Sequence, residues 1–243
     1  MMKKRPLSVV GQGISEKCRE SLCRMGFDVV ILPPYDRLGA GVDTHADLMI
    51  FPIDGKAFIY SEVAKNLPEL ANDLHLRGYE TVEVDRPPAN CYPYDIPLNC
   101  LQVGRYIFCK KKYTSPSVIE YAEENGYAVV NTNQGYARCT ACPIGNMGII
   151  SADPSMLKAA DSARLDILSI CEGYVRLEGY DHGFIGGACG VYENTLYFAG
   201  DISRHPDYES IADFCRERGV EVVSLSDEPL CDVGSIFFFD GQK

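Results

Sequence analysis

A histidine and an aspartate alternate in one short stretch of the sequence, His45-Ala46-Asp47. Side chains two residues apart point to the same side of an extended chain, so the imidazole and the carboxylate are expected to face one way. Such a pair suits proton transfer, because the carboxylate can orient a histidine that accepts or donates the proton. A loop histidine capped by the neighbouring acid is the alternative interpretation.

Two cysteines, Cys139 and Cys142, are separated by two residues, as in metal knuckles and redox pairs. Only one such pair occurs, and a structural zinc site needs two further ligands, which Cys100 or Cys189 supplies only if the fold brings them close. A redox dithiol usually begins a helix, whereas this pair leads through Pro143 into an apolar run. Metal binding is therefore a weak alternative to packing or to lining a substrate site.

A third candidate, Asp181-His182-Gly183, follows an irregular segment over residues 172–180. Gly173 and Gly179 give that segment conformational freedom, so it either covers a site as a lid or simply connects two strands. The sequence contains no Walker loop, Gly-x-Ser-x-Gly elbow or His-Glu-x-x-His motif. Nucleotide hydrolysis, serine hydrolysis and zinc proteolysis therefore have no support.

The net charge of the 243 residues is −11. This argues against a nucleic-acid-binding protein, because affinity for phosphate backbones needs clustered lysine and arginine. No apolar run is long enough for a signal peptide or a membrane span. We therefore expect a cytoplasmic protein whose eleven cysteines are thiols, ligands or nucleophiles rather than disulfides. Because no stretch reads as a linker, we expect a single domain over residues 1–243.

One order of elements recurs along the chain: two short apolar runs around a turn, a helical pattern and a third apolar run. Each unit spans about 35–50 residues, a period that indicates a repeat architecture. The predicted strand, strand, helix and strand of the four complete units cover 46–51, 56–60, 62–77 and 79–84; 98–103, 105–109, 115–125 and 127–131; 140–144, 147–151, 154–163 and 165–171; and 184–191, 195–199, a helix opened by His205-Pro206-Asp207, and 220–225.

The two ends of the chain supply the parts of a fifth unit. A strand over 7–10, a helix over 15–25 and a strand over 27–32 lack a first strand, and residues 233–239 form a strand that stands alone. Pairing the two closes a ring without an exposed sheet edge, which explains why a soluble protein ends in a strand as apolar as 236–239. The fold class is therefore predicted as α/β, with five ββαβ blades.

Five ββαβ units closed through the termini resemble the pentein fold, a pseudo-fivefold α/β propeller, of the guanidine-modifying superfamily. Its members include arginine deiminases, dimethylarginine dimethylaminohydrolases, amidinotransferases and a non-catalytic ribosome anti-association factor. Gly186-Gly187, followed by the hairpin residues 196–200, resembles the glycine-glycine strand and hairpin of the dimethylaminohydrolases. Residues 47–51, Asp-Leu-Met-Ile-Phe, resemble the acidic strand in the first unit of that group.

The resemblance implies a central pore surrounded by the first strands, with the functional residues where those strands end. Catalytic members attack an amidine carbon with a cysteine thiolate, move protons with a histidine and hold the guanidinium with carboxylates. The residues expected in these roles are Cys231, then Cys100, as nucleophile, His45 or His182 as proton carrier, Asp47 and Asp232 as cation ligands, and Asn99, Asp181 and Cys189 as further substrate-binding positions.

The resulting prediction is a hydrolase of amidine or guanidino C–N bonds that binds a small cationic substrate in an acidic pore, without metal or organic cofactor. No nucleic-acid or membrane partner is expected, and a homo-oligomer stays open. The alternative is a non-catalytic pentein that binds a protein or ribosomal partner. A cysteine, a histidine and two aspartates gathered at one pore mouth favour catalysis, whereas a pore filled with apolar side chains favours binding.

Overall fold

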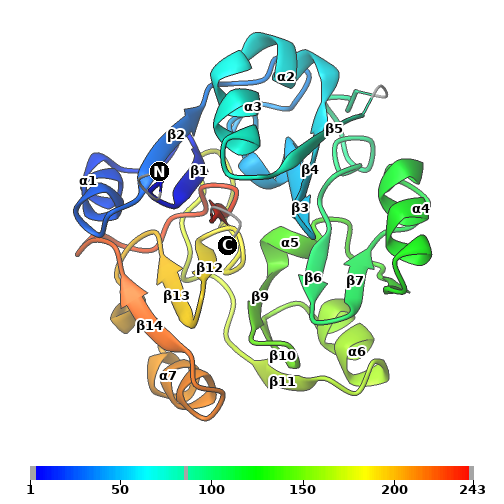
Figure 1. The fold of residues 1–243 in the computed structure, drawn as a ribbon. Helices are drawn as coiled ribbons and strands as arrows, with labels where there is room; N and C mark the ends of the chain where they lie inside the picture. The colour runs from blue at the N-terminus through cyan, green and yellow to red at the C-terminus, as the bar shows by residue number, and fades with distance from the viewer. Residues whose placement is uncertain (1–3, 85–86, 241–243) are drawn as a thin grey trace.

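The computed structural model describes residues 4–84 and 87–240, and in these residues five three-stranded sheets surround a common centre (Figure 1). The helices that connect the second strand of each unit to the third lie on the outside of the ring, and the first strand of each unit faces the middle (Figure 1). The architecture is the five-bladed α/β propeller that the repeats predicted.

The first complete unit illustrates the pattern. Strand β3 (Ile50–Ile53) runs antiparallel to β4 (Lys56–Tyr60), and β4 runs parallel to β5 (Glu80–Val84). Asp54 and Gly55 join β3 to β4 with φ of 47° and 73°, as a two-residue hairpin of the favoured twist requires. The predicted helix over 62–77 is divided into α2 (Ser61–Asn66) and α3 (Pro68–His75), because Pro68 cannot continue a helix from Leu67 but suits a first turn.

The next three units repeat this order of antiparallel pair, helix and parallel strand. Their elements are β6 (Leu101–Val103), β7 (Tyr106–Cys109), α4 (Pro116–Glu124) and β8 (Ala128–Asn131); α5 (Ala137–Thr140), β9 (Ala141–Ile144), β10 (Gly148–Ser151), α6 (Pro154–Ser162) and β11 (Asp166–Ser169); and β12 (Cys189–Tyr192), β13 (Thr195–Phe198), the short 3-10 helix η2 (Ile202–Arg204), α7 (Tyr208–Arg216) and β14 (Glu221–Ser224).

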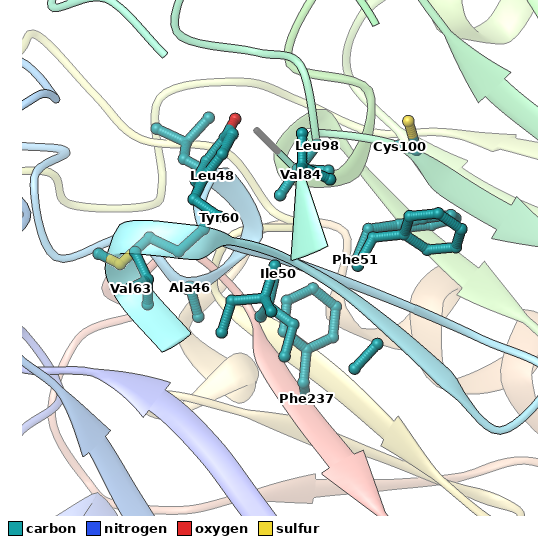
Figure 2. Packing of buried hydrophobic residues seen from close by; sticks show 14 of the residues in the cluster. Ala46, Leu48, Ile50, Phe51, Tyr60, Val63, Val84, Leu98, Cys100 and Phe237 are labelled. Carbon is teal, nitrogen blue, oxygen red and sulfur yellow. The ribbon is translucent and has the colours of Figure 1, made fainter. Parts of the chain in front are cut away.

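The fifth unit joins the two ends of the chain, as predicted. Strand β1 (Leu7–Gly11) lies between β15 (Ile236–Phe239), to which it is antiparallel, and β2 (Asp28–Leu32), to which it is parallel. Helix α1 (Glu16–Arg24) connects β1 to β2, and its N-cap Ser15 accepts a hydrogen bond from the backbone of Cys18. Apolar side chains of β3 and β15 pack together, as Phe51, Ile50 and Phe237 show in Figure 2.

The first strands are shorter than predicted, because a helical turn or bend comes before them. The 3-10 helix η1 (Ala46–Leu48) precedes β3, and α5 precedes β9. These lead-in residues are buried, and several of them are apolar, so from the sequence alone they resemble the beginning of a buried strand. The predicted first strands began at Ala46, Leu98, Thr140, Phe184 and Val233, whereas the observed ones begin at Ile50, Leu101, Ala141, Cys189 and Ile236.

The centre of the ring has two different ends. At the turn end of the first strands, mostly apolar side chains of all five surround a cavity of about 200 Å³, among them Pro52, Pro143, Val191 and Phe237. At the other end the lead-in segments meet, and their polar side chains form the site described next. Across residues 4–84 and 87–240, no helix has the length and apolar character needed to cross a membrane.

Candidate functional site

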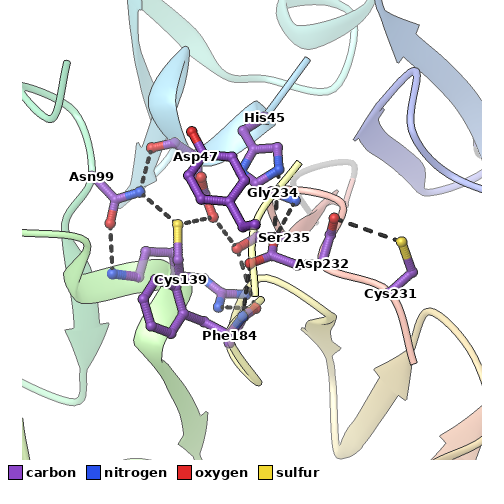
Figure 3. Close-up of polar contacts among 12 residues, drawn as sticks. His45, Asp47, Asn99, Cys139, Phe184, Cys231, Asp232, Gly234 and Ser235 are labelled. Carbon is purple, nitrogen blue, oxygen red and sulfur yellow. Dashed lines mark hydrogen bonds and ion pairs between the residues drawn. The ribbon is translucent and has the colours of Figure 1, made fainter. Parts of the chain in front are cut away.

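The lead-in segments of different units bring a set of polar side chains together at the centre (Figure 3). His45 and Asp47 come from the turn before β3, Cys139 from α5, and Asp232 and Ser235 from the residues before β15. These residues come from three of the five units, those that begin with β3, β9 and β15. Asn99, which precedes β6 in a fourth unit, lies beside them. Helical turns position two of these side chains, because Asp47 lies in η1 and Cys139 in α5.

The carboxylate of Asp47 is the hub of the cluster, and its residue is 0% exposed. Its Oδ2 accepts a hydrogen bond of 2.5 Å from Ser235 Oγ and one of 3.1 Å from Cys139 Sγ. Among the described residues, Oδ1 has no hydrogen-bond partner. Burial raises the pKa of Asp47, and the nearby Asp232 adds to the rise. A buried acceptor without a partner is costly, so this oxygen is positioned for a donor or a cation.

Asn99 and Asp47 together hold the thiol of Cys139. The amide Nδ2 of Asn99 donates to Cys139 Sγ at 3.1 Å and to the backbone oxygen of Asp47 at 3.3 Å. Asn99 Oδ1 accepts from the backbone N–H of Arg138 at 2.8 Å, which fixes the orientation of the amide. Burial and the neighbouring Asp47 raise the pKa of Cys139 well above its ordinary value. The thiol therefore keeps its proton as long as no cation neutralises the negative charge of the carboxylates beside it.

His45 and Asp232 face each other on the other side of the cluster. His45 Nε2 lies 3.8 Å from Asp232 Oδ1, which is close but too long for a hydrogen bond. Asp232 Oδ1 accepts from Gly234 N at 3.0 Å and Oδ2 from Phe184 N at 2.9 Å. Burial raises the pKa of Asp232 to about 6, while burial lowers the pKa of His45. At neutral pH the histidine is therefore neutral and able to accept a proton.

Glycines let the backbone approach these side chains closely. A Cβ on Gly187 would lie 2.0 Å from Asp232 Oδ1, and one on Gly183 would lie 2.5 Å from Asp232 Cβ. Gly234 has φ of 71° and sits against His45, so a side chain there is excluded both by space and by backbone conformation. Three glycines thus provide the space that Asp232 and His45 occupy.

A buried cation lies below the cluster. The guanidinium of Arg138 donates to the backbone oxygens of Gly186 at 2.8 Å and Cys189 at 2.9 Å, and the residue is 6% exposed. Its charge lowers the pKa of Asp232, acting against the larger effect of burial. Arg138 thus links the lead-in segments before β9 and β12 and supplies positive charge beside the carboxylates.

An open cavity of about 660 Å³ reaches the cluster from the surface. His45 and Asp232 form part of its wall, and residues 177–179 of the irregular segment form part of its rim. The ionisable side chains in its lining are carboxylates, a thiol and one imidazole, without lysine or arginine. The lining residues are Gln12, Gly13, Ala40, Gly41, Asp43, Thr44, His45, Leu177, Glu178, Gly179, Cys231 and Asp232.

The two cysteines predicted as nucleophiles lie outside the cluster. Cys231 lines the cavity, but its Sγ contacts the backbone oxygen of Asp232 at 3.8 Å on the side away from His45 (Figure 3). Burial and Asp232 raise the pKa of Cys231. Cys100 is buried, and a hydrogen bond with Cys109 together with burial raises its pKa well above the usual range. Neither thiol touches the imidazole of His45.

The remaining predicted residues are dispersed. Asp181 is exposed, and His182 lines a separate cavity of about 70 Å³, with its Nδ1 3.0 Å from the backbone oxygen of Gly183. Cys189 Sγ lies 3.1 Å from Cys142 Sγ. Cys139 and Cys142 thus engage different partners and do not share a site, because the helical turn ends between them and β9 begins.

Sequence reasoning placed His45, Asp47, Asn99 and Asp232 at the centre, and the structure brings these four together. It gave Cys139 a role in packing, in lining the substrate site or, as a weak alternative, in metal binding, and it did not single out Arg138 or Ser235. The spacing Asp232-Val233-Gly234-Ser235 contained a usable signal, because a serine directly after glycine and before an apolar strand sits where the strand begins. Cys139 and Asp47, which share a hydrogen bond, are 92 residues apart in the sequence, so no local sequence pattern indicates their contact.

Comparison with known proteins places the chain in a family and in a fold. The model of the family of unknown function DUF6873 matches residues 9–237. No curated protein matches the sequence. Among solved structures, a dimethylarginine dimethylaminohydrolase variant in adduct with S-methyl-L-thiocitrulline is similar with a TM-score of 0.56 at 12% identity, covering 93% of each chain.

Two further solved structures share the architecture. An amidinotransferase from Microseira wollei in the saxitoxin biosynthetic pathway has a TM-score of 0.55 at 12% identity, covering 99% of this chain and 95% of its own. The C. jejuni agmatine deiminase has a TM-score of 0.50 at 10% identity, covering 92% and 88%. The match over nearly the whole chain and the five closed ββαβ units lead to one conclusion: the protein belongs to the DUF6873 family and has the pentein fold of these amidino- and guanidino-modifying enzymes.

Proposed function

We propose that the protein hydrolyses a C–N bond of a small amidinium or guanidinium compound, with Cys139 as the nucleophile in place of Cys231 or Cys100. The observation that carries the proposal is the shared position of one thiol, one imidazole and two carboxylates. Cys139 Sγ donates a hydrogen bond to Asp47 Oδ2 at 3.1 Å. A ring nitrogen of His45 lies within 4.8 Å of Cys139 Sγ and of a carboxylate oxygen of Asp47. Asp232 Oδ1 lies 3.8 Å from His45.

The charge of the cavity favours a cationic substrate. Asp43, Glu178 and Asp232 contribute carboxylates to its lining, and Asp47 lies behind them. A planar amidinium has N–H groups that match the two oxygens of a carboxylate. Asp47 Oδ1, which lacks a partner among the described residues, accepts one of these N–H groups in the proposed complex.

Substrate binding supplies the activation of the thiol. The largest cause of the raised pKa of Cys139 is burial, and the second is the negative charge of Asp47. An amidinium bound to Asp47 offsets that second cause, so the pKa of the thiol falls when substrate is present. The thiol proton then passes to neutral His45, which leaves a thiolate beside the electrophilic carbon.

The reaction is balanced with these groups alone. The Cys139 thiolate forms a C–S bond with the amidine carbon, and the C–N bond breaks as His45 returns its proton to the departing amine. Water then attacks the thioether carbon of the amidino adduct, His45 takes the proton from that water, and the sulfur leaves as thiolate. Return of the proton to Cys139 restores the starting state.

A non-catalytic binding protein is the second candidate. Two observations favour it: Cys139 is 2% exposed, and mostly apolar side chains of the first strands line the opposite end of the pore. Under this hypothesis the acidic cavity holds a cationic group of a ligand or of a protein partner. The thiol of Cys139 then contributes only to packing.

Labelling with 2-chloroacetamidine separates the two candidates. We expect the reduced protein to be alkylated at Cys139 near neutral pH, faster than by neutral iodoacetamide and more slowly when arginine or agmatine is present. The Cys139→Ser variant should lose this fast phase, and the Cys231→Ser variant should keep it. Slow labelling confined to the exposed Cys23, Cys91 and Cys171 would rule out an activated thiol and favour the binding protein.

A further inference from the structure

Three side chains at the centre combine the donor types that bind divalent transition metals. One ligand atom from each of His45, Asp47 and Cys139 lies within 4.8 Å of the other two, and all three residues are buried. From this arrangement we propose that His45, Asp47 and Cys139 bind a zinc-class divalent ion. Metal binding goes beyond the proposed hydrolysis and does not rest on it.

The separation of the donors suits a tetrahedral ion. Zinc bonds of about 2.0 Å to nitrogen or oxygen and about 2.3 Å to sulfur put neighbouring ligand atoms roughly 3.3–3.7 Å apart. A ring nitrogen of His45, Cys139 Sγ and one oxygen of the Asp47 carboxylate lie within 4.8 Å of one another. Adjustments of an ångström or less therefore bring the three atoms to bonding distance. Nitrogen, oxygen and sulfur in one site favour zinc or cobalt over magnesium or calcium, which take oxygen ligands.

An independent observation points to a missing cationic partner. Asp47 is 0% exposed, and its Oδ1 has no hydrogen-bond partner among the described residues, although its Oδ2 has two. A buried carboxylate oxygen is rarely left in this state, because the lost hydration is not replaced. Coordination by Oδ1 satisfies the atom without disturbing the hydrogen bond that Ser235 donates to Oδ2.

The surrounding hydrogen bonds resemble the outer support that metal ligands usually have. Asn99 Nδ2 donates to Cys139 Sγ at 3.1 Å, and this bond persists when the sulfur becomes a thiolate. Ser235 Oγ donates to Asp47 Oδ2 at 2.5 Å. Groups of this kind fix the direction of a ligand and strengthen metal binding.

Charge is balanced when the ion binds. Cys139 releases its proton to solvent on binding, so a divalent ion meets one thiolate, one carboxylate and one neutral imidazole. The three protein ligands leave a fourth position for water. Asp232 Oδ1, 3.8 Å from His45 Nε2, borders the site from the cavity side and can accept a hydrogen bond from that water.

The ion and an amidinium ligand exclude each other, since both need the Asp47 carboxylate. Zinc bound through Cys139 also removes the nucleophile proposed above. The metal would therefore act as an inhibitor of hydrolysis, while the metal-free form would react with substrate.

Titration with Co²⁺ tests the proposal without reference to activity. The reduced, chelator-treated protein should bind one Co²⁺ per chain, with the near-ultraviolet charge-transfer band of a cobalt–thiolate bond and the visible bands of a tetrahedral ion, and Zn²⁺ should displace it. Cys139→Ser should abolish the charge-transfer band and weaken binding at least about 100-fold, above the loss typical of outer-sphere changes.

Two further variants make the result decisive. Cys231→Ser removes a thiol that lies close to the cluster but outside it, and should leave the spectrum unchanged. His45→Gln should weaken binding while retaining the cobalt–thiolate band, which keeps the test valid if Cys139→Ser unfolds. No band in folded wild-type protein at millimolar Co²⁺, or a band that survives Cys139→Ser, would overturn the proposal. Amidine labelling is carried out on metal-free protein and cobalt titration needs no substrate. The hydrolysis proposal and the metal-binding proposal can therefore fail independently of each other.

Discussion

Ser235 donates a hydrogen bond of 2.5 Å from its hydroxyl to the carboxylate of Asp47, a residue 188 positions earlier in the chain. The bond joins the segment before the last strand to the segment before β3, and so ties the closing unit of the ring to its neighbour. Ser235 has φ of 70°, and its N–H donates to Gly187 at 2.7 Å. An unfavourable backbone conformation therefore places the hydroxyl where the buried carboxylate needs it.

Replacement of Ser235 tests both parts of this relationship. Ser235→Ala should lower the free energy of unfolding by about 2 kcal/mol, because a buried carboxylate loses a donor. Ser235→Gly removes the same hydroxyl but adopts the left-handed conformation without strain, so it should be about 1 kcal/mol more stable than the alanine variant. Urea unfolding of both variants measures the difference. Equal stabilities of the alanine and glycine variants would contradict backbone strain at Ser235. Wild-type stability in both variants would show that the hydrogen bond to Asp47 does not stabilise the fold.

Asp47→Asn should stabilise the protein above neutral pH while abolishing amidine labelling. The amide oxygen can keep the hydrogen bonds from Ser235 and Cys139, and the buried charge is removed. Burial raises the folded-state pKa of Asp47 above its unfolded value, so the wild-type protein loses stability as pH rises through the folded-state pKa. The stability gap between variant and wild type should therefore widen from pH 5 to pH 8.

Thermal unfolding at several pH values, with a chelator present, measures this gap. Asp47→Ala is the matched control, because it removes the charge but leaves Ser235 and Cys139 without their acceptor, and it should be less stable than Asp47→Asn at every pH. A gap that narrows with rising pH would show that Asp47 is stabilised as a carboxylate by groups other than those described.

The sequence was sufficient for the architecture because each unit carries its own signals. Alternation, helical spacing and glycine turns are local, and they recur in all five units, so the ring and its closure through β1 and β15 followed from repetition. Asp47 and Asp232 were also found, because polar residues beside apolar strands stand out. The lead-in turns were missed because three buried residues such as Ala46–Leu48, directly before an apolar run, are too few to distinguish a 3-10 turn from the beginning of a strand.

The position of Cys139 beside Asp47 could not be predicted from the sequence for a different reason. Cys139 contacts Asp47 only because α5 turns its side chain inward, whereas Cys231 is directed away by the alternation that points its neighbour Asp232 into the centre. Both cysteines stand beside apolar strands, and no neighbour of Cys139 in the sequence reveals the direction of its side chain. The partner is set by contacts between units, which single-sequence patterns do not contain.

Arg138 should prove essential for stability. Its guanidinium donates hydrogen bonds to two backbone carbonyl oxygens and offsets the negative charge of Asp232. Arg138→Met should therefore lower the free energy of unfolding by about 3 kcal/mol or more. Arg138→Lys should recover only part of the loss, because one ammonium replaces the planar fork that reaches both oxygens. Arg216→Met, at an exposed arginine paired with Asp213, is the control and should change stability by less than about 0.5 kcal/mol. Similar losses for Met at both positions would contradict a structural role for the buried cation.

Gly187 should tolerate no side chain, because it provides the space that Asp232 occupies. A Cβ there would lie 2.0 Å from Asp232 Oδ1, and the Gly187 backbone oxygen accepts hydrogen bonds from Val233 at 3.1 Å and Ser235 at 2.7 Å. Gly187→Ala must therefore displace either the carboxylate or this backbone pairing, and we expect a loss of at least about 2 kcal/mol together with loss of amidine labelling.

The control for this change is Gly13→Ala, on the rim of the same cavity. A Cβ on Gly13 meets only Thr44 Oγ1 at 3.6 Å, which is ordinary contact, so stability and labelling should stay near wild type. Differential scanning calorimetry and 2-chloroacetamidine labelling of both variants decide the matter. If Gly187→Ala unfolds at the wild-type temperature and labels normally, Asp232 does not need its observed position, and the two-carboxylate site would have to be abandoned.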